Sequence, residues 1–136
     1  MRDAVIVSTA RTPLAKSMRG AFNATHPVKM GAWSVEAAVK RAGLEGAEIE
    51  DVVIGAASQG GAQGFNIGRQ VALRAGLPQE VSGMTMDRQC SSGLMAIATA
   101  AKQIIVDRMD ICVGGGLESI SSMRSGGGNP PQRDEE

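Results

Sequence analysis

Apolar and polar positions along the chain divide it into short β-branched runs and longer segments with helical spacing. The runs predict strands because they contain Val and Ile and are bounded by Gly, Pro or charged residues. The segments predict helices because their apolar residues recur every three or four positions. The predicted strands are 4–8, 51–56, 84–87 and 110–113, and the predicted helices are 28–42, 67–75 and 91–107. This order, β-α-β-α-β-α-β, indicates an α/β layered domain with parallel strands and right-handed crossovers.

Several boundaries carry local signals. Gly43 follows the first helix, where a left-handed cap is expected. Asn66 is a plausible N-cap for the second helix, which should stop at Ala75–Pro78. The first strand, Ala4–Ser8, is a short β-branched run with four consecutive apolar residues, so it is predicted to be buried on both faces.

The third predicted helix has no polar face. Between Gly93 and Ala101 its most polar residue is Thr99. A helix that is apolar all round is expected to be buried all round. We therefore expect it to lie between two layers, one of which this sequence does not encode.

Length and composition suit one domain. The chain has 136 residues, and we assign 1–124 to the domain and 125–136 to a disordered tail, because the tail is rich in Gly, Pro and charge. Lys plus Arg and Asp plus Glu number 14 each, so nothing favours nucleic acid or an anionic membrane as a partner. No apolar stretch is long enough to span a bilayer, and no signal peptide precedes the first strand, so a cytoplasmic location is expected.

Cys90 is the candidate nucleophile. It falls between a strand and a helix, where free N–H groups and the helix dipole stabilise negative charge. Ser91, Ser92 and Gly93 are small, so a bulky acyl group could approach. A structural cysteine at a helix start is an equally good interpretation from position alone, and no base is evident beside it.

The other candidates favour structural roles. Cys112 lies within a predicted strand and is expected to be a buried, inert thiol. His26, the only histidine, is expected to be a solvated loop residue. The segment Gly60–Gly64 could bind a phosphate, but a surface turn is the better interpretation. No metal-ligand spacing is found.

Five segments in order resemble the thiolase family, which comprises acetyl-CoA acetyltransferases and 3-ketoacyl-CoA thiolases. The strongest is 86–94, MDRQCSSGL, which resembles the family's active-site segment. The other four are 10–13, 66–70, 75–78 and 114–121. The resemblance covers residues 3–122, the amino-terminal part of the family.

The resemblance implies a fold in which two similar halves form five layers, with the helix after Cys90 as one of two central helices. It implies that Cys90 takes an acyl group from a 3-ketoacyl-CoA or acetyl-CoA and passes it to CoA or acetyl-CoA. The backbone N–H of Cys90 would help to bind the oxyanion. Coenzyme A thioesters would be the substrates, no separate cofactor or metal would be needed, and homodimers or homotetramers would form through the strand at 84–87.

Some family features have no counterpart in this sequence. The family's basic histidine, its second cysteine, its CoA-gripping loop domain and the fifth strand of its first half are absent, and we expect a truncated chain or one piece of a longer enzyme. The alternative is a non-catalytic remnant that acts as an interaction module. A ketoacyl synthase is disfavoured because Gly93 follows the thiolase pattern.

Overall fold

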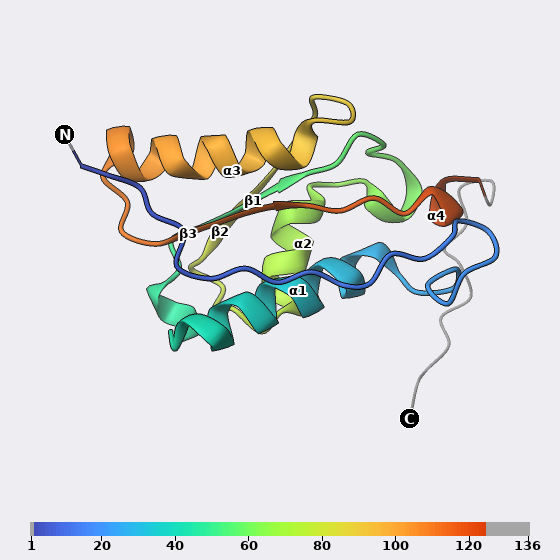
Figure 1. Ribbon diagram of the computed structural model, residues 1–136, viewed down its shortest axis with the longest axis horizontal. Helices are drawn as coiled ribbons and strands as arrows, with labels where there is room; N and C mark the ends of the chain where they lie inside the picture. Colours follow the sequence, from blue (N-terminus) through green and yellow to red (C-terminus); the bar gives the residue numbers. More distant parts are fainter. Residues whose placement is uncertain (1, 125–136) are drawn as a thin grey trace.

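A three-stranded parallel sheet with helices on both faces forms the protein in a computed structural model that describes residues 2–124 (Figure 1). The principal elements are α1 (Pro27–Ala42), β1 (Asp51–Gly55), α2 (Ile67–Arg74), β2 (Ser82–Met86), α3 (Ser92–Lys102), β3 (Cys112–Gly116) and α4 (Ile120–Arg124). Two short 3-10 turns (Gly46–Glu48 and Gly61–Gln63) and a π-helical turn (Gln103–Asp107) complete them. The predicted α/β class is confirmed. The predicted disorder of 125–136 concerns residues outside the described part.

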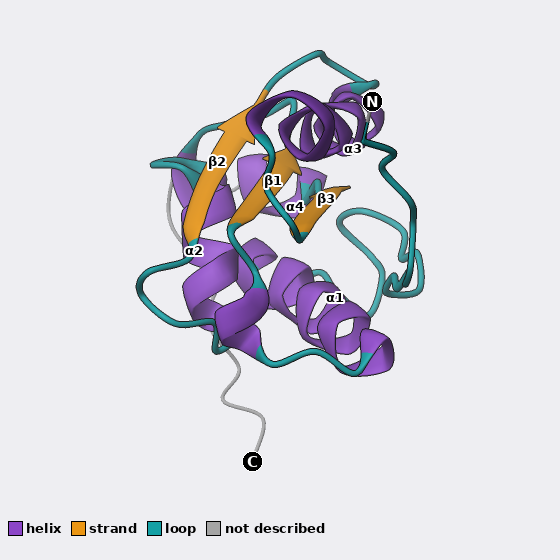
Figure 2. Cartoon of the chain, turned by 90° about the vertical axis from the view of Figure 1, so that its left-hand side faces the viewer, coloured by secondary structure: helices purple, strands orange, loops and turns teal. Residues whose placement is uncertain are grey.

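The sheet has the order β2-β1-β3, and both pairings are parallel. Val53 in the central strand lies opposite Met84 on one side and Gly114 on the other. α1 and α2 cover one face of the sheet, and α3 covers the opposite face (Figure 2). Parallel strands require crossover connections, which α2 supplies between β1 and β2 and α3 supplies between β2 and β3.

The helix boundaries follow the sequence signals. Gly43 takes φ 71° after α1, and its N–H donates to the carbonyls of Val39 and Lys40. The side chain of Asn66 caps α2 by accepting a hydrogen bond from Arg69 N–H at 3.3 Å. Gly76 takes φ 77° just after α2. These positions were predictable because left-handed backbone and N-cap geometry select few residue types.

The prediction of a buried first strand at Ala4–Ser8 is wrong. No strand is assigned there, and Val5, Ile6 and Val7 are 71–76% exposed. The segment is held by side chains instead. Arg2 pairs with Asp110, and Arg41 Nη1 donates to Thr9 O at 2.8 Å. A strand needs a hydrogen-bonded neighbour as well as an apolar sequence, and within residues 2–124 none pairs with this run.

The last strand begins two residues later than predicted. Glu50 explains the shift, because its carboxylate accepts hydrogen bonds from the N–H groups of Asp110 and Ile111. Those amides therefore face a side chain rather than a neighbouring strand. Regular pairing starts at Cys112, opposite Asp51.

Two hydrophobic clusters lie on the two faces of the sheet. The larger is shared by β1, α1 and α2, and Ile67 and Val71 are fully buried within it. The smaller contains Val53, Ala96 and Ala100, so its side of α3 is built from small residues. α3 can therefore approach the strands closely.

Glycines make that approach backbone to backbone. A Cβ added at Gly55 would lie 2.1 Å from the carbonyl carbon of Ser92. A Cβ at Gly114 would lie 2.8 Å from Ile97 Cα, and one at Gly116 would lie 2.8 Å from Gly93 Cα. The start of α3 thus rests directly on the carboxyl ends of β1 and β3.

The expectation that α3 is buried all round holds for one face only. Ser92, Ala96 and Ala100 are buried against the sheet. On the outer face, Leu94 is 73% exposed and Ile97 is 41% exposed, and Val106 in the following π turn is 70% exposed. The outer face is apolar as the sequence indicates, but no described residues cover it.

The glycine contacts predict a sharp difference between two neighbouring substitutions. Gly55→Ala should lower the free energy of unfolding by about 2 kcal/mol or more, because the new methyl group meets rigid backbone. Gly115→Ala should change it by no more than about 0.5 kcal/mol, because an added Cβ there meets nothing within 4 Å. Urea denaturation measures both values. An equal loss of unfolding free energy in the two variants would contradict the close contact between Gly55 and Ser92.

Candidate active site

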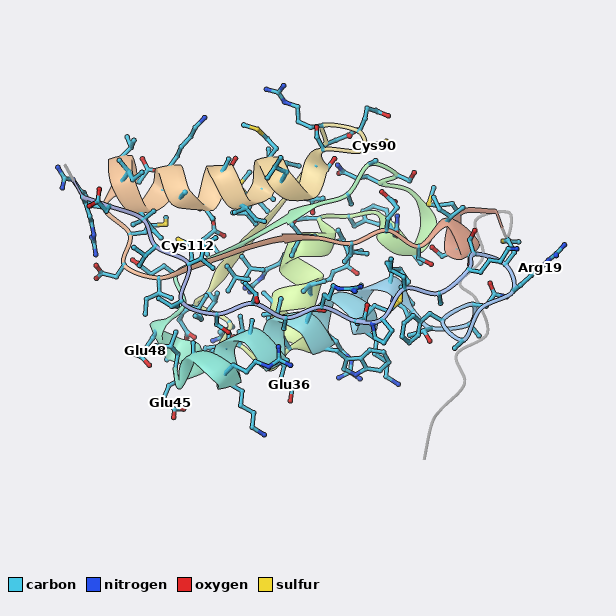
Figure 3. The ribbon with its side chains drawn as sticks, in the orientation of Figure 1. Arg19, Glu36, Glu45, Glu48, Cys90 and Cys112 are labelled. Atoms are coloured by element: carbon cyan, nitrogen blue, oxygen red, sulfur yellow. The ribbon has the colours of Figure 1, made fainter. Side chains whose placement is uncertain are left out.

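Cys90 lies in the turn between β2 and α3, as predicted. β2 ends at Met86, Ser91 is the N-cap of α3, and the helix begins at Ser92. Cys90 is exposed. In Figure 3 it stands at the start of α3, at the far end of the helix from Cys112. The thiol is therefore accessible at the carboxyl edge of the sheet.

Hydrogen bonds brace this turn on both sides of the cysteine. The Asp87 carboxylate accepts Gln89 N–H at 2.7 Å, and Ser91 Oγ donates to Arg88 O at 2.8 Å. Gln89 takes φ 52°, a left-handed conformation that is uncommon for a residue with a Cβ. A sharp turn of this kind presents the next side chain outward, as in the nucleophile elbows of hydrolases.

The start of α3 gives the site a local positive potential. The first N–H groups of a helix lack partners within it, and the helix dipole adds to their effect. Cys90 immediately precedes the N-cap of α3, at the positive end of this dipole. An oxyanion formed on an acyl group bound to Cys90 would be stabilised by this potential.

A second bonded cluster fixes the loops at the same edge of the sheet. The Glu118 carboxylate accepts hydrogen bonds from Ala57 N–H at 2.8 Å, from Ser58 N–H at 3.3 Å and from Gln63 Nε2 at 2.7 Å. Gln63 is fully buried, and it also accepts a hydrogen bond from Ser119 N–H. The loops after β1 and β3 are thereby tied to each other next to the Cys90 turn.

The Gly60–Gly64 segment contains Gln63 and is therefore part of this hydrogen-bonded cluster. It forms a 3-10 turn whose backbone closes on itself, with Gln63 N–H donating to Gly60 O at 3.0 Å. The prediction of a turn is confirmed, but its expected place on the surface is wrong, because Ala62, Gln63 and Gly64 are buried. The roles of Gln63 and Glu118 are not predictable from the sequence, because a Gln and a Glu that are far apart in the chain form no motif with a recognisable spacing.

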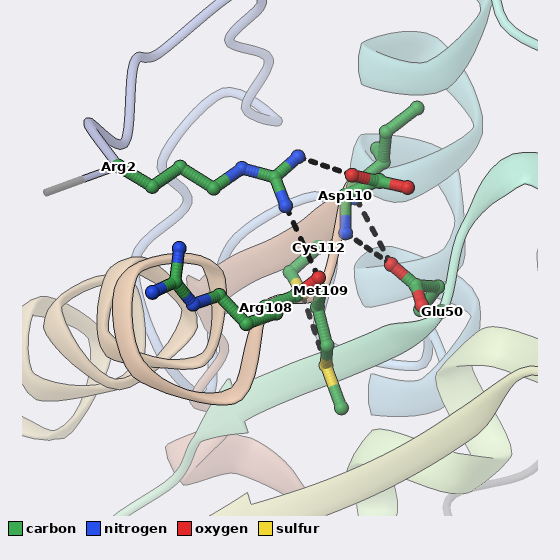
Figure 4. Close-up of polar contacts among 7 residues, drawn as sticks. Arg2, Glu50, Arg108, Met109, Asp110 and Cys112 are labelled. Carbon is green, nitrogen blue, oxygen red and sulfur yellow. Dashed lines mark hydrogen bonds and ion pairs between the residues drawn. The ribbon is translucent and has the colours of Figure 1, made fainter.

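Cys112 is not part of the site. It lies at the other end of the sheet, beside Met109, Asp110 and Glu50 (Figure 4). Burial raises the pKa of its thiol to about 11, and the negative charges of Asp51 and Glu50 add to the effect. Cys112 is half-buried rather than buried as expected, and its raised pKa agrees with an inert thiol, which stays a prediction.

His26 is a helix cap rather than a solvated loop residue. Its Nδ1 accepts a hydrogen bond from Val28 N–H at 3.3 Å at the start of α1. Burial lowers the pKa of its imidazole. α1 and α3 lie on opposite faces of the sheet, so the fold does not bring His26 to Cys90 (Figure 1).

Residues 2–124 contain neither a cluster of metal-ligating side chains nor a membrane-spanning helix. No three His, Cys, Asp or Glu side chains gather there as a metal site would require. None of the helices there has the length and apolar character needed to cross a membrane.

Comparison with known proteins decides the family. The profile described as "Thiolase, N-terminal domain" matches residues 4–130. The chain belongs to the thiolase family. It is 42% identical over 123 residues to a 3-ketoacyl-CoA thiolase of Bacillus subtilis, covering 90% of this chain and 32% of that protein. It is 41% identical over 120 residues to the peroxisomal 3-ketoacyl-CoA thiolase 2 of Arabidopsis thaliana, covering 88% of this chain and 26% of that protein.

Solved thiolase structures share the fold. The acetyl-CoA acetyltransferase of Bacillus anthracis superposes with a TM-score of 0.84 at 35% identity, over 99% of this chain and 35% of that one. The Acat5 thiolase of Ascaris suum, solved in complex with coenzyme A, gives 0.83 at 31% identity, over 99% and 34%. The chain thus spans about a third of the length of the thiolases it matches.

The different surroundings of the two thiols predict selective alkylation. At pH 8 a thiol with a pKa of about 11 is only about 0.1% thiolate, so Cys112 should react slowly with iodoacetamide. Its rate should rise about tenfold per pH unit until the pH approaches 11. Cys90, which is exposed, should be modified first.

Peptide-level mass spectrometry follows both residues in one sample. In denaturant the two rates should converge to within about threefold, since the difference comes from the fold. A folded protein in which Cys112 reacts as fast as Cys90 at pH 8 would contradict the assignment.

Proposed function

We propose that this chain carries the nucleophilic half of a thiolase reaction. In this proposal Cys90 takes an acyl group from a 3-ketoacyl-CoA or acetyl-CoA as a thioester and passes it to CoA or acetyl-CoA. The observation that carries the proposal is the exposed Cys90 thiol at the start of α3, within the braced turn that follows β2. Membership of the thiolase family supports it.

The chemistry of thioester exchange suits this position. The Cys90 thiolate adds to the acyl carbonyl, and the resulting oxyanion needs hydrogen-bond donors until the leaving group departs. The leaving group is CoA thiolate when acetyl-CoA is the donor, and it is the enolate of acetyl-CoA, released by C–C cleavage, when a 3-ketoacyl-CoA is the donor. The helix start provides positive potential for the oxyanion. A base must also deprotonate the incoming thiol or a substrate carbon, and the single histidine of the chain already caps α1 on the other face of the sheet.

Substrate and assembly are proposed by analogy with the relatives. One matched structure was solved with coenzyme A, which supports a CoA thioester as the ligand. β2 lies at an edge of the sheet, and we propose that in the complete enzyme this edge joins homodimers or homotetramers. Both cysteines are free thiols, which fits the reducing cytoplasm expected from the sequence.

Acetyl-CoA tests the proposal directly. The isolated chain should gain one acetyl group on Cys90 and release about one equivalent of CoA without further turnover, because acyl transfer onward needs a base. Cys90→Ser should abolish labelling, and Cys112→Ser, which removes the thiol outside the site, should not. Intact-mass and peptide mass spectrometry measure the product. A wild-type chain that gains no acetyl group would refute the proposal that Cys90 is the nucleophile. Sustained release of CoA would refute the proposal that the base must come from outside the chain.

A second candidate function is an interaction module without catalysis. The observation that favours it is the exposed apolar outer face of α3, with Leu94 and Ile97. Monomeric proteins seldom leave a continuous apolar face in water, so such a face marks a contact surface.

Size-exclusion chromatography with light scattering tests this candidate. The isolated chain should run larger than a monomer at micromolar concentration, and Leu94→Glu should shift it towards the monomer. Leu73→Glu is the matched control, because Leu73 is also a half-exposed leucine on a helix but lies on α2. A wild-type chain that remains a monodisperse, well-folded monomer would argue against the module.

A further inference from the structure

Ser92 is a buried serine bonded to the peptide group before Cys90. It is the first residue of α3, and only 3% of its surface is exposed. Its Oγ accepts a hydrogen bond from Arg88 N–H at 2.8 Å and donates one to Gln89 O at 2.6 Å. The backbone N–H of Ser92 donates to the same oxygen at 3.1 Å. One residue therefore holds the Gln89 carbonyl with two hydrogen bonds.

This carbonyl fixes the direction of the Cys90 N–H. Both groups belong to the single peptide unit between Gln89 and Cys90, and in a trans peptide the C=O and N–H point in opposite directions. Because the oxygen faces Ser92, the N–H of Cys90 faces away from it. No described residue accepts a hydrogen bond from this N–H. It is available to an oxygen atom that approaches from outside.

The orientation needs support from a side chain. Gln89 takes φ 52°, which is disfavoured for a residue with a Cβ. Rotation of the following peptide unit changes only ψ of Gln89 and φ of Cys90, so the backbone alone does not prevent it. The Ser92 hydroxyl links Arg88 N–H to Gln89 O across the turn and so opposes this rotation.

We infer that Ser92 is a positioning residue that aims the Cys90 N–H at the oxyanion of the acyl-transfer step. This inference depends on the proposed function, because it assigns a role to that same turn. Ser92 itself does not touch the substrate. It acts through the peptide group whose N–H does.

Two reagents separate this role from a general effect on the thiol. With p-nitrophenyl acetate, the Cys90 thiolate adds to the carbonyl carbon, which forms the carbon–sulfur bond and an oxyanion. The C=O bond then re-forms, p-nitrophenolate leaves, and the acetyl group stays on the sulfur. With iodoacetamide, the same thiolate displaces iodide from a CH2 carbon, and no oxyanion forms. The ratio of the two rates at Cys90 reports oxyanion stabilisation independently of how much thiolate is present.

Ser92→Ala should lower this ratio about tenfold or more, because one oxyanion donor contributes rate factors of this order or larger. Ser92→Thr keeps the hydroxyl and should restore the ratio to within about threefold of wild type. Ser82→Ala is the matched control, since it removes a hydroxyl bonded to Glu50 O at the opposite end of β2 and should leave the ratio unchanged. Peptide mass spectrometry assigns each modification to Cys90, and circular dichroism checks the fold.

An unchanged ratio in Ser92→Ala, or an equal loss in Ser92→Thr, would overturn the inference. If Ser92→Ala does not fold, hydrogen exchange in the wild-type chain decides. The Cys90 amide should exchange nearly as fast as in an unstructured peptide, and strong protection would overturn the inference. Failure of the proposed function is a separate result, namely a wild-type chain that reacts with p-nitrophenyl acetate but is never acetylated by acetyl-CoA.

Discussion

The contact between the backbone of α3 and the ends of β1 and β3 is the constraint on which the site depends. Gly55 and Gly116 leave no side chain between strand and helix, so Ser92 and Gly93 rest on the sheet itself. This contact fixes the distance between the first turn of α3 and the sheet, and with it the direction in which the helix starts. The turn that holds Cys90 has little freedom left, because β2 fixes its other end. Glycine is used here for close approach rather than for unusual dihedral angles.

The same contact explains why α3 is made of small and apolar residues. Its inner face packs closely against the backbone of the sheet, and only small side chains such as those of Ala96 and Ala100 fit there. Its outer face carries Leu94 and Ile97, although water covers them in this chain. A surface helix would be expected to place charged residues there. The composition of α3 is therefore typical of a helix that is covered on both faces. This agrees with the comparison, in which the chain spans about a third of the length of the thiolases it matches.

The sequence predicted most of the fold and the place of Cys90, for reasons that are local. Helix caps such as Asn66 and Gly43, and the strand–turn–helix order around Cys90, depend on neighbours within a few residues. The errors have different causes. Ala4–Ser8 has the composition of a strand, but no described residue pairs with it, which is a non-local fact. The error at His26 is local, because a histidine is an uncommon N-cap and its side chain caps α1 beside Pro27. The hydrogen bonds of Ser92 to Arg88 and Gln89 are not predictable either, since a serine at a helix start usually indicates only a cap.

Acyl transfer requires both the stabilisation of an anion and the movement of a proton, and the surroundings of Cys90 provide only for the first. Stabilising an anion needs fixed dipoles, and a helix start with a braced turn supplies them from a short, continuous stretch of chain. Moving a proton needs a titratable group in contact with the reacting atom, which contributes a further factor of about 10² to 10⁴. Such a group must come from a segment that packs against the site, and the outer face of α3 is the surface against which a further layer would pack. The fold thus places the proposed nucleophile, Cys90, at the start of a helix whose apolar outer face no described residue covers.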